Sequence, residues 1–329
     1  MHCMREVMVI LALSWIGLVS TLPALPKLSP QARRAYEAGS ELRRFTIDRR
    51  QNPATGLPDT LTDLDVLEFA LTLENLETAF YQQGFAKFPD TDFAALGLQP
   101  ADIVNLKSIG GTEATHVTTL SAAISGAGAA PVEPCTYDFK LTTAANMITT
   151  AGVLENIGVS AYLAAAPLLK SPAILTVAAE IVTVEARHQT FIRTASKAAA
   201  IPGAFDTPLG IRAVFSLASP FIQSCPAGSN LAITPFPTLE LSPGQNDLKV
   251  VGGAQIKLQS TATATAMSCA FVNGGQTGGT AFSPFQDGAC VIPMGLNGVT
   301  YVHLASAMPA TGVLTDNITV AGPIVMIIN

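Results

Sequence analysis

The sequence predicts an α+β multidomain protein in which a four-helix bundle is followed by a small β-sandwich-like domain. The first observation behind this prediction is the helical spacing of apolar residues over residues 60–225. The second is a change near residue 225, after which short alternating runs are separated by Gly, Asn and Ser. Because 329 residues can bury two cores, we place the bundle at 60–225 and the β domain at 232–329.

Four long helices are expected at 63–87, 99–124, 141–170 and 171–197, with a shorter fifth at 208–223. Capping residues at Thr60 to Asp63 begin the first helix, and Pro89 follows its end. Pro172 suits the first turn of the fourth helix, where a missing N–H costs little. Short connections after the first and third helices and a long one after the second predict two hairpins joined by a long crossover, in up-down-down-up order.

Strands are expected at Leu248–Val251, Gln255–Leu258, Val299–Val302 and Ile318–Val320. The single Asn317-Ile318-Thr319 sequon predicts an exposed, glycosylated strand end. His303 is isolated in this region, and we interpret it as a structural residue.

The first 22 residues have the pattern of a secretory signal peptide. A charged start precedes an apolar run, Val7 to Val19, that ends in small and Pro-flanked positions. This run is too short to span a bilayer, and no later segment is expected to do so. The sequence therefore predicts a secreted protein, extracellular or in the cell wall, without a membrane partner. The alternative is a buried N-terminal helix.

Residues 23–59 are interpreted as an N-terminal extension or a pro-segment. Three arginine pairs, Arg33-Arg34, Arg43-Arg44 and Arg49-Arg50, suit either dibasic processing or a solvated helix face. Residues 1–50 hold eight basic and four acidic side chains, whereas the rest of the chain holds ten basic and twenty acidic ones. This acidic remainder disfavours a nucleic-acid partner.

Four cysteines remain after the predicted signal peptide: Cys135, Cys225, Cys269 and Cys290. An even number in an oxidising compartment predicts two disulfides, for which three pairings are possible. Cys269 and Cys290 lie in one β-rich segment and are expected to pair, which leaves Cys135 for Cys225. A zinc site is disfavoured because the sequence has no C-x-x-C spacing.

Two of the three later histidines follow a glutamate by three residues, in the motifs Glu113 to His116 and Glu185 to His188. This spacing places both side chains of a motif on one helix face. The other two helices share a tripeptide, Leu73-Glu74-Asn75 and Leu154-Glu155-Asn156. Each half of the bundle thus supplies a Glu helix and then a Glu-x-x-His helix, and pseudo-twofold symmetry would bring these residues to the centre.

Four buried carboxylates would repel one another and resist desolvation, so they require cations between them. Two divalent ions, Fe or Mn, would balance the four negative charges while the neutral imidazoles add ligands. A lone Glu-x-x-His is usually a surface feature, but here two occur with two repeated glutamates. The predicted ligands are Glu74, Glu113, His116, Glu155, Glu185 and His188.

Glu77 lies on nearly the same face as Glu74, but Gly158 occupies the matching position in the second half. Glu77 is therefore expected beside the ligands or as an alternative ligand. Tyr81 and Tyr162 each follow their glutamate by seven residues, which favours core packing with a polar tip near the site. Two further glutamates are interpreted as ordinary helix charges: Glu68 and Glu180.

The segments Phe69 to Tyr81 and Glu113 to His116 resemble the ferritin-like-domain family, in particular plant desiccation-related proteins and secreted fungal stress-response and sexual-development proteins. This resemblance covers residues 60–225. It implies a ferritin-like di-metal bundle in which the six residues above are the ligands. Ferritin-like bundles include iron stores, manganese catalases and oxygenases, so the family leaves the reaction open.

We expect redox chemistry on O2 or peroxide at a di-iron or di-manganese centre, with a stress-protective role implied by the resemblance. The second hypothesis is a non-enzymatic secreted stress, desiccation or cell-wall-associated protein, with a structural or vestigial metal site and a β domain that binds a glycan or cell-wall partner. Iron storage ranks third, because a symmetric storage shell would be hindered by the added β domain. The oligomeric state stays open.

Overall fold

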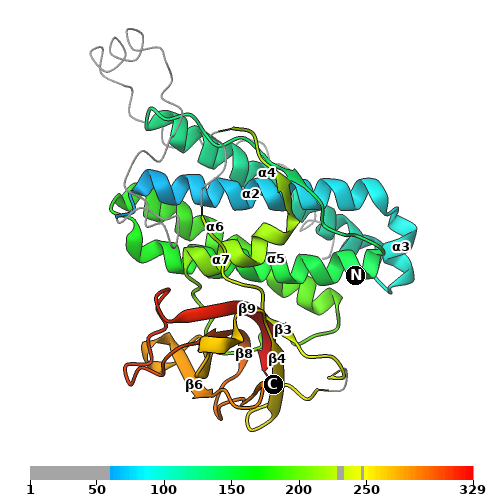
Figure 1. The fold of residues 1–329 in the computed structure, drawn as a ribbon. Helices are drawn as coiled ribbons and strands as arrows, with labels where there is room; N and C mark the ends of the chain where they lie inside the picture. The colour runs from blue at the N-terminus through cyan, green and yellow to red at the C-terminus, as the bar shows by residue number, and fades with distance from the viewer. Residues whose placement is uncertain (1–59, 228–232, 246–247, 329) are drawn as a thin grey trace, which may run out of the picture. The chain divides into compact units, whose positions relative to one another are not determined.

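The computed structural model describes residues 60–227, 233–245 and 248–328; the expected signal peptide and extension at 1–59 lie outside this part. Four long helices make up the bundle (Figure 1): α2 (Asp63–Lys87), α4 (Pro100–Gly126), α5 (Ala144–Ala165) and α6 (Pro172–Ala195). The short α3 (Asp90–Ala95) lies between α2 and α4, and α7 (Ile211–Ala218) follows the bundle. The third and fifth helices end earlier than expected, as a 3₁₀ turn containing a proline follows each.

The beginnings of three long helices follow from local side-chain chemistry. At the start of α2, the Thr62 N–H donates to Asp65 (2.7 Å) and the Asp65 N–H donates to the Thr62 hydroxyl (3.3 Å), which completes a capping box. Thr143 caps α5 and Ser171 caps α6, and the side-chain hydroxyl of each accepts one backbone N–H. Pro172 occupies the first turn of α6, as the sequence predicts.

The helices pack as two hairpins, α2 with α4 and α5 with α6, and the crossover 127–143 joins them. A disulfide between Cys135 and Cys225 fixes this crossover to the segment after α7, beside the paired strands β1 (Thr136–Tyr137) and β2 (Ile222–Ser224). The predicted bundle with a long crossover is therefore confirmed.

The crossover is also held from inside the bundle by Glu68. Its side chain is fully buried, and one carboxylate oxygen accepts the Val132 N–H at 2.9 Å. Our interpretation of Glu68 as an ordinary helix charge was wrong, because helical spacing alone does not show that a loop from elsewhere covers that position. Burial raises the pKa of Glu68 to about 7. Glu180, by contrast, is exposed.

The C-terminal region forms two antiparallel sheets. One contains β3 (Glu240–Leu241), β4 (Gln255–Gln259) and β7 (Ala289–Val291). The other has the order β6 (Thr280–Pro284), β5 (Ser268–Asn273), β8 (Gly298–Ala305) and β9 (Thr319–Ile328). The expected strand at Leu248–Val251 is wrong: this segment turns, with the Leu248 and Val251 N–H groups donating to Gln245 and Lys249. The other three expected strands fall in β4, β8 and β9.

The two sheets share one hydrophobic core. Ile256 from β4, Phe271 from β5 and Leu304 from β8 belong to the same buried cluster. The Cys269–Cys290 disulfide links β5 to β7 and so joins the sheets covalently. Both predicted disulfides and the sandwich-like pairing of sheets are therefore present.

Strand β8 also contacts the bundle. Tyr301 is fully buried, and its hydroxyl donates to the Asn156 carbonyl (3.1 Å) and lies 2.6 Å from the Ser160 hydroxyl. Tyr301 belongs to the same apolar cluster as Leu154 of α5. The sheet thus supports α5 at the residues that follow Glu155.

His303 of β8 is buried, with its ring edge-on to Phe236 at 6.2 Å. Neither ring nitrogen has a hydrogen-bond partner among the described residues. Burial lowers its pKa to about 3, so the imidazole is neutral at physiological pH. These surroundings fit the structural role that the sequence indicated.

Within the described ranges, Ala144–Leu168 is the one helix long and apolar enough to cross a membrane, judged by length and composition alone. Half of its most apolar window is buried inside the protein, where α5 packs against α6 and α2. The core helix of a bundle has the same composition, so this finding gives little support to a membrane span.

Replacing Glu68 by Gln tests the buried carboxyl. The pKa of Glu68 is about 7 in the folded state, whereas the ordinary pKa of a glutamate is 4.5. Between these two pH values the folded state keeps a proton that the unfolded state has lost, so the free energy of unfolding falls as pH rises through this window. Gln keeps an acceptor for the Val132 N–H without charge. Relative to wild type, Glu68→Gln should be more stable by on the order of 1 to 3 kcal/mol at pH 8 and nearly equal below pH 4.5.

Urea unfolding across this pH range measures the difference, and the exposed substitution Glu180→Gln on α6 is the control. A Glu68→Gln stability difference that does not change with pH would contradict the assignment.

Candidate metal centre

All six predicted ligands lie on the four long helices and are buried. These residues are between 0 and 7% exposed, and each hairpin contributes one Glu helix and one Glu-x-x-His helix. The members are Glu74 on α2, Glu113 and His116 on α4, Glu155 on α5, and Glu185 and His188 on α6. The structure therefore places these six residues together at the bundle centre.

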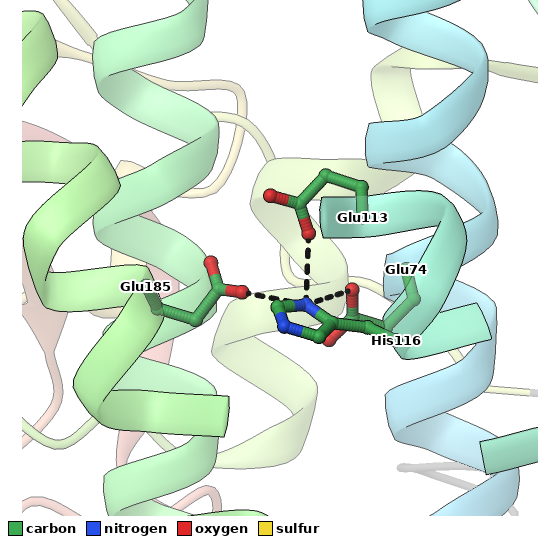
Figure 2. A group of neighbouring side chains, drawn as sticks. All are labelled: Glu74, Glu113, His116 and Glu185. Carbon is green, nitrogen blue, oxygen red and sulfur yellow. Dashed lines mark hydrogen bonds and ion pairs between the residues drawn. The ribbon is translucent and has the colours of Figure 1, made fainter. Parts of the chain in front are cut away.

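The donor atoms form two overlapping groups, and within each group they lie within 4.8 Å of one another. The first consists of Glu74, Glu113, His116 and Glu185 (Figure 2), and the second of Glu113, Glu155, Glu185 and His188. Both Glu-x-x-His glutamates belong to both groups, whereas each remaining Glu pairs with one His. Each group could hold a metal ion, and the two groups have the Glu113 and Glu185 carboxylates in common.

Carboxylate oxygens surround the Nδ1 atom of His116 on three sides (Figure 2). Its distances are 3.2 Å to Glu74, 3.1 Å to Glu113 and 3.1 Å to Glu185. One ring nitrogen has at most one proton, so hydrogen bonding does not account for three equal contacts. Donor atoms bound to one cation at about 2.1 Å are about 3 Å apart, so these spacings suit a shared ion.

In the second group, too, a histidine nitrogen lies close to carboxylate oxygens, and here the atoms form no hydrogen bond. His188 Nδ1 lies 2.8 Å from Glu113 Oε1 and 3.2 Å from Glu155 Oε2. Despite these distances, none of the three atoms forms a hydrogen bond with any described residue, and neither oxygen of Glu185 does. Buried charged atoms without partners are unfavourable, and directing them at a common cation removes that penalty. Oxygen and imidazole donors of this kind suit divalent metal ions.

Thr112 fixes the orientation of His188. The Thr112 hydroxyl donates to the Ile109 carbonyl at 2.6 Å, and it lies 2.9 Å from His188 Nε2. It is therefore placed to accept the Nε2 proton, so Nδ1 faces the carboxylates and can offer its lone pair to a cation once the Nδ1 proton is lost. Sequence analysis missed Thr112, because its partner belongs to another helix and no spacing relates the two.

Both predicted tyrosines touch the ligands, each across the bundle. Tyr162 of α5 donates to Glu74 Oε1 at 2.5 Å, and Tyr81 of α2 donates to Glu155. Burial and the neighbouring glutamates raise the pKa of both phenols well above the ordinary value, so both remain protonated donors. The sequence repeat indicated that both tyrosines lie near the site. Only the folded structure shows that each tyrosine bonds the glutamate of the other hairpin.

Glu77 adds a fifth buried carboxylate beside the six residues. It is 4% exposed and has no hydrogen bond with the described residues. Burial and then the charge of Glu185 raise its pKa well above the ordinary value. A Cβ at Gly158 would lie 2.9 Å from Glu185 Oε2 and 3.3 Å from Glu77 Oε1. The missing side chain at Gly158 thus makes room for two carboxylates, and it makes the two halves of the centre unequal.

Charge within the centre is balanced by protons when cations are absent. Burial opposes ionisation of Glu113, but His116 and His188 outweigh it and lower the pKa of Glu113 to about 2. Burial likewise opposes charge on the imidazoles, but the carboxylates raise the pKa of His116 to about 12 and of His188 to about 10. Burial raises the pKa of Glu74 to about 7. Cations that bind here must displace these protons.

The fold and the buried ligand set define a class of protein: a four-helix bundle in which Glu and Glu-x-x-His helices converge on a carboxylate–histidine centre. Residues 62–198 match the family described as the ferritin-like domain, so the helical region is ferritin-like, in agreement with the resemblance. A similar protein is Protein rds1 of Schizosaccharomyces pombe (strain 972 / ATCC 24843), 26% identical over 196 residues. The match covers 59% of this chain and 48% of rds1, so the chain spans about half the length of this curated relative.

Adding a methyl group at Gly158 should separate fold stability from metal binding. Gly158→Ala favours the helix by up to about 1 kcal/mol, yet it displaces the Glu185 and Glu77 carboxylates. We expect the metal-free protein to be at least as stable as wild type, while Mn²⁺ or Fe²⁺ affinity falls about tenfold or more.

The matched control is Gly152→Ala on the same helix, where a Cβ would meet only Ile192 at an ordinary 3.4 Å. Thermal unfolding and metal titration measure the two effects. Equal metal affinities in the two variants would show that the space at Gly158 is irrelevant to the centre.

Proposed function

We propose that this chain is a secreted di-metal protein that binds two iron or manganese ions and reacts with O2 or peroxide. The observation that carries the proposal is the sharing of Glu113 and Glu185 by two otherwise separate ligand groups. Four carboxylates and two imidazoles in this order provide donors for two adjacent ions. Two redox-active ions held side by side, when bound, can exchange electrons with a single oxygen species.

The chain's own residues would hold this centre in place and keep it dry. Tyr81 and Tyr162 hold the two outer glutamates by hydrogen bonds, and Thr112 holds His188. Water is excluded, since no predicted ligand is more than 7% exposed. Rigid ligands in a water-poor site lower the reorganisation that accompanies a change in metal charge.

Glu77 bears on the oxidation state that the centre favours. Four carboxylates balance two divalent ions, so an ionised Glu77 would add one uncompensated negative charge. That charge favours either a bound proton or a higher metal charge. Because burial and the neighbouring carboxylates raise the pKa of Glu77, a protonated Glu77 suits two divalent ions, and loss of this proton would accompany a higher metal charge.

Secretion is the second part of the proposal. Two disulfides are typical of proteins that mature in an oxidising compartment. The signal-like pattern over residues 1–22 is consistent with that environment.

The second candidate function is a non-enzymatic secreted protein for stress, desiccation or the cell wall, with a structural or vestigial metal site. Near-complete burial of the ligands favours it, because a substrate much larger than O2 or hydrogen peroxide would not reach them. A glycan or cell-wall partner of the β region belongs to this candidate. Metal-loaded protein that consumes neither O2 nor peroxide would favour it over the redox proposal.

Metal content tests the centre itself. Glu185→Gln keeps the side-chain volume and removes one shared charge, so both ion positions should weaken together. After loading with Mn²⁺ or Fe²⁺ and desalting, elemental analysis should find about two ions per wild-type chain and fewer than one in the variant.

Glu180→Gln, on the exposed part of the same helix, is the control and should retain about two ions. Fewer than about one tightly bound ion in wild type, or two ions retained by Glu185→Gln, would contradict the proposed centre.

A further inference from the structure

An apolar cavity lies inside the bundle next to the Glu74 side of the centre. Its volume is about 30 Å³, and all four long helices contribute to its wall. Leu73, directly before Glu74, lines it, and so does Tyr162, whose hydroxyl donates to Glu74. The cavity is thus separated from the candidate centre by the Tyr162–Glu74 pair.

The wall of this cavity is hydrocarbon. Apart from Tyr162, its lining side chains are alanine, valine, leucine, isoleucine and phenylalanine, and the Tyr162 hydroxyl is already engaged with Glu74. A water molecule needs two to four polar partners, so a cavity of this kind stays dry although it exceeds the roughly 10 to 15 Å³ that a water requires. Hydrogen peroxide needs polar partners for the same reason. A small apolar molecule does not.

The residues that line the cavity differ in their exposure to solvent. Leu169, Ile174 and Ala178, around the α5–α6 connection, are half-buried, whereas Leu73 and Leu120 are buried. The apolar space therefore extends from the periphery of the bundle towards Glu74. Alanines on three helices leave it open: Ala70, Ala161, Ala165 and Ala178.

We propose that this cavity holds dioxygen on its way to the Glu74 side of the centre. The inference rests on the proposed function and narrows its substrate to O2 in preference to peroxide. Size and polarity carry it, because the space admits a diatomic molecule and offers no hydrogen bond to a polar one. Tyr162 then separates the dry cavity from the charged ligands.

Xenon tests the cavity without any metal, because it enters dry apolar cavities of protein interiors. Xenon binding is measured by ¹²⁹Xe NMR on metal-free protein. Ala178→Leu should fill the cavity from α6 and abolish xenon binding. The neighbouring Ala179 is exposed and does not line the cavity, so Ala179→Leu is the matched control and should bind xenon like wild type. Ala70→Leu fills the same space from α2 and replaces Ala178→Leu if that variant does not fold.

The same proteins, loaded with Fe²⁺ or Mn²⁺, are then oxidised with O2 or with H2O2. The filled variant should react with O2 at least fivefold more slowly than the control, while its rate with H2O2 and its metal content stay unchanged. Absence of xenon in wild type, or an equal change in both rates, would overturn the proposal. Wild type that binds xenon but holds less than one metal ion would refute the proposed function and the O2 role, while leaving the apolar cavity established.

Discussion

The central constraint on this protein is the cost of burying negative charge. Glu74, Glu113, Glu155 and Glu185 meet in the middle of the bundle with less than 2% of their surface exposed, and Glu77 adds a fifth carboxylate. Carboxylates in such a place are tolerated only when opposite charge or protons compensate them. The imidazoles lie close to these oxygens without hydrogen-bond geometry in the second group, an arrangement that is compatible with a metal site.

Much of the surrounding structure serves to hold these side chains at fixed positions. Tyr81 and Tyr162 exchange partners between the two halves, so each hairpin fixes a carboxylate of the other. Tyr301 extends this support from the sheet to α5, immediately after Glu155. Glu68 fixes the crossover that joins the hairpins. The position of each ligand thus depends on contacts with several elements, which is what a rigid metal site requires.

Several of these supports could not be predicted from the sequence, for a common reason. The partner of Thr112 is on α6, and the loop that covers Glu68 belongs to the crossover, so neither interaction has a fixed spacing along the chain. The error at Leu248–Val251 has another origin. Its alternating apolar residues suit a strand, but local backbone hydrogen bonds turn the segment, and it pairs with no neighbouring strand among the described residues.

The sequence by itself predicted the helices, the six Glu and His residues that cluster in the bundle, and the disulfide pairs that the structure contains. Helical periodicity, the i to i+3 spacing of Glu113 with His116, and the repeat of Leu-Glu-Asn are local properties that each segment carries wherever it packs. Only the tertiary structure decided which glutamates belong to both ligand groups, which tyrosine bonds which carboxylate, and why Gly158 has no side chain. These features depend on distances between helices, and such distances are set when side chains from all four helices fill one interior.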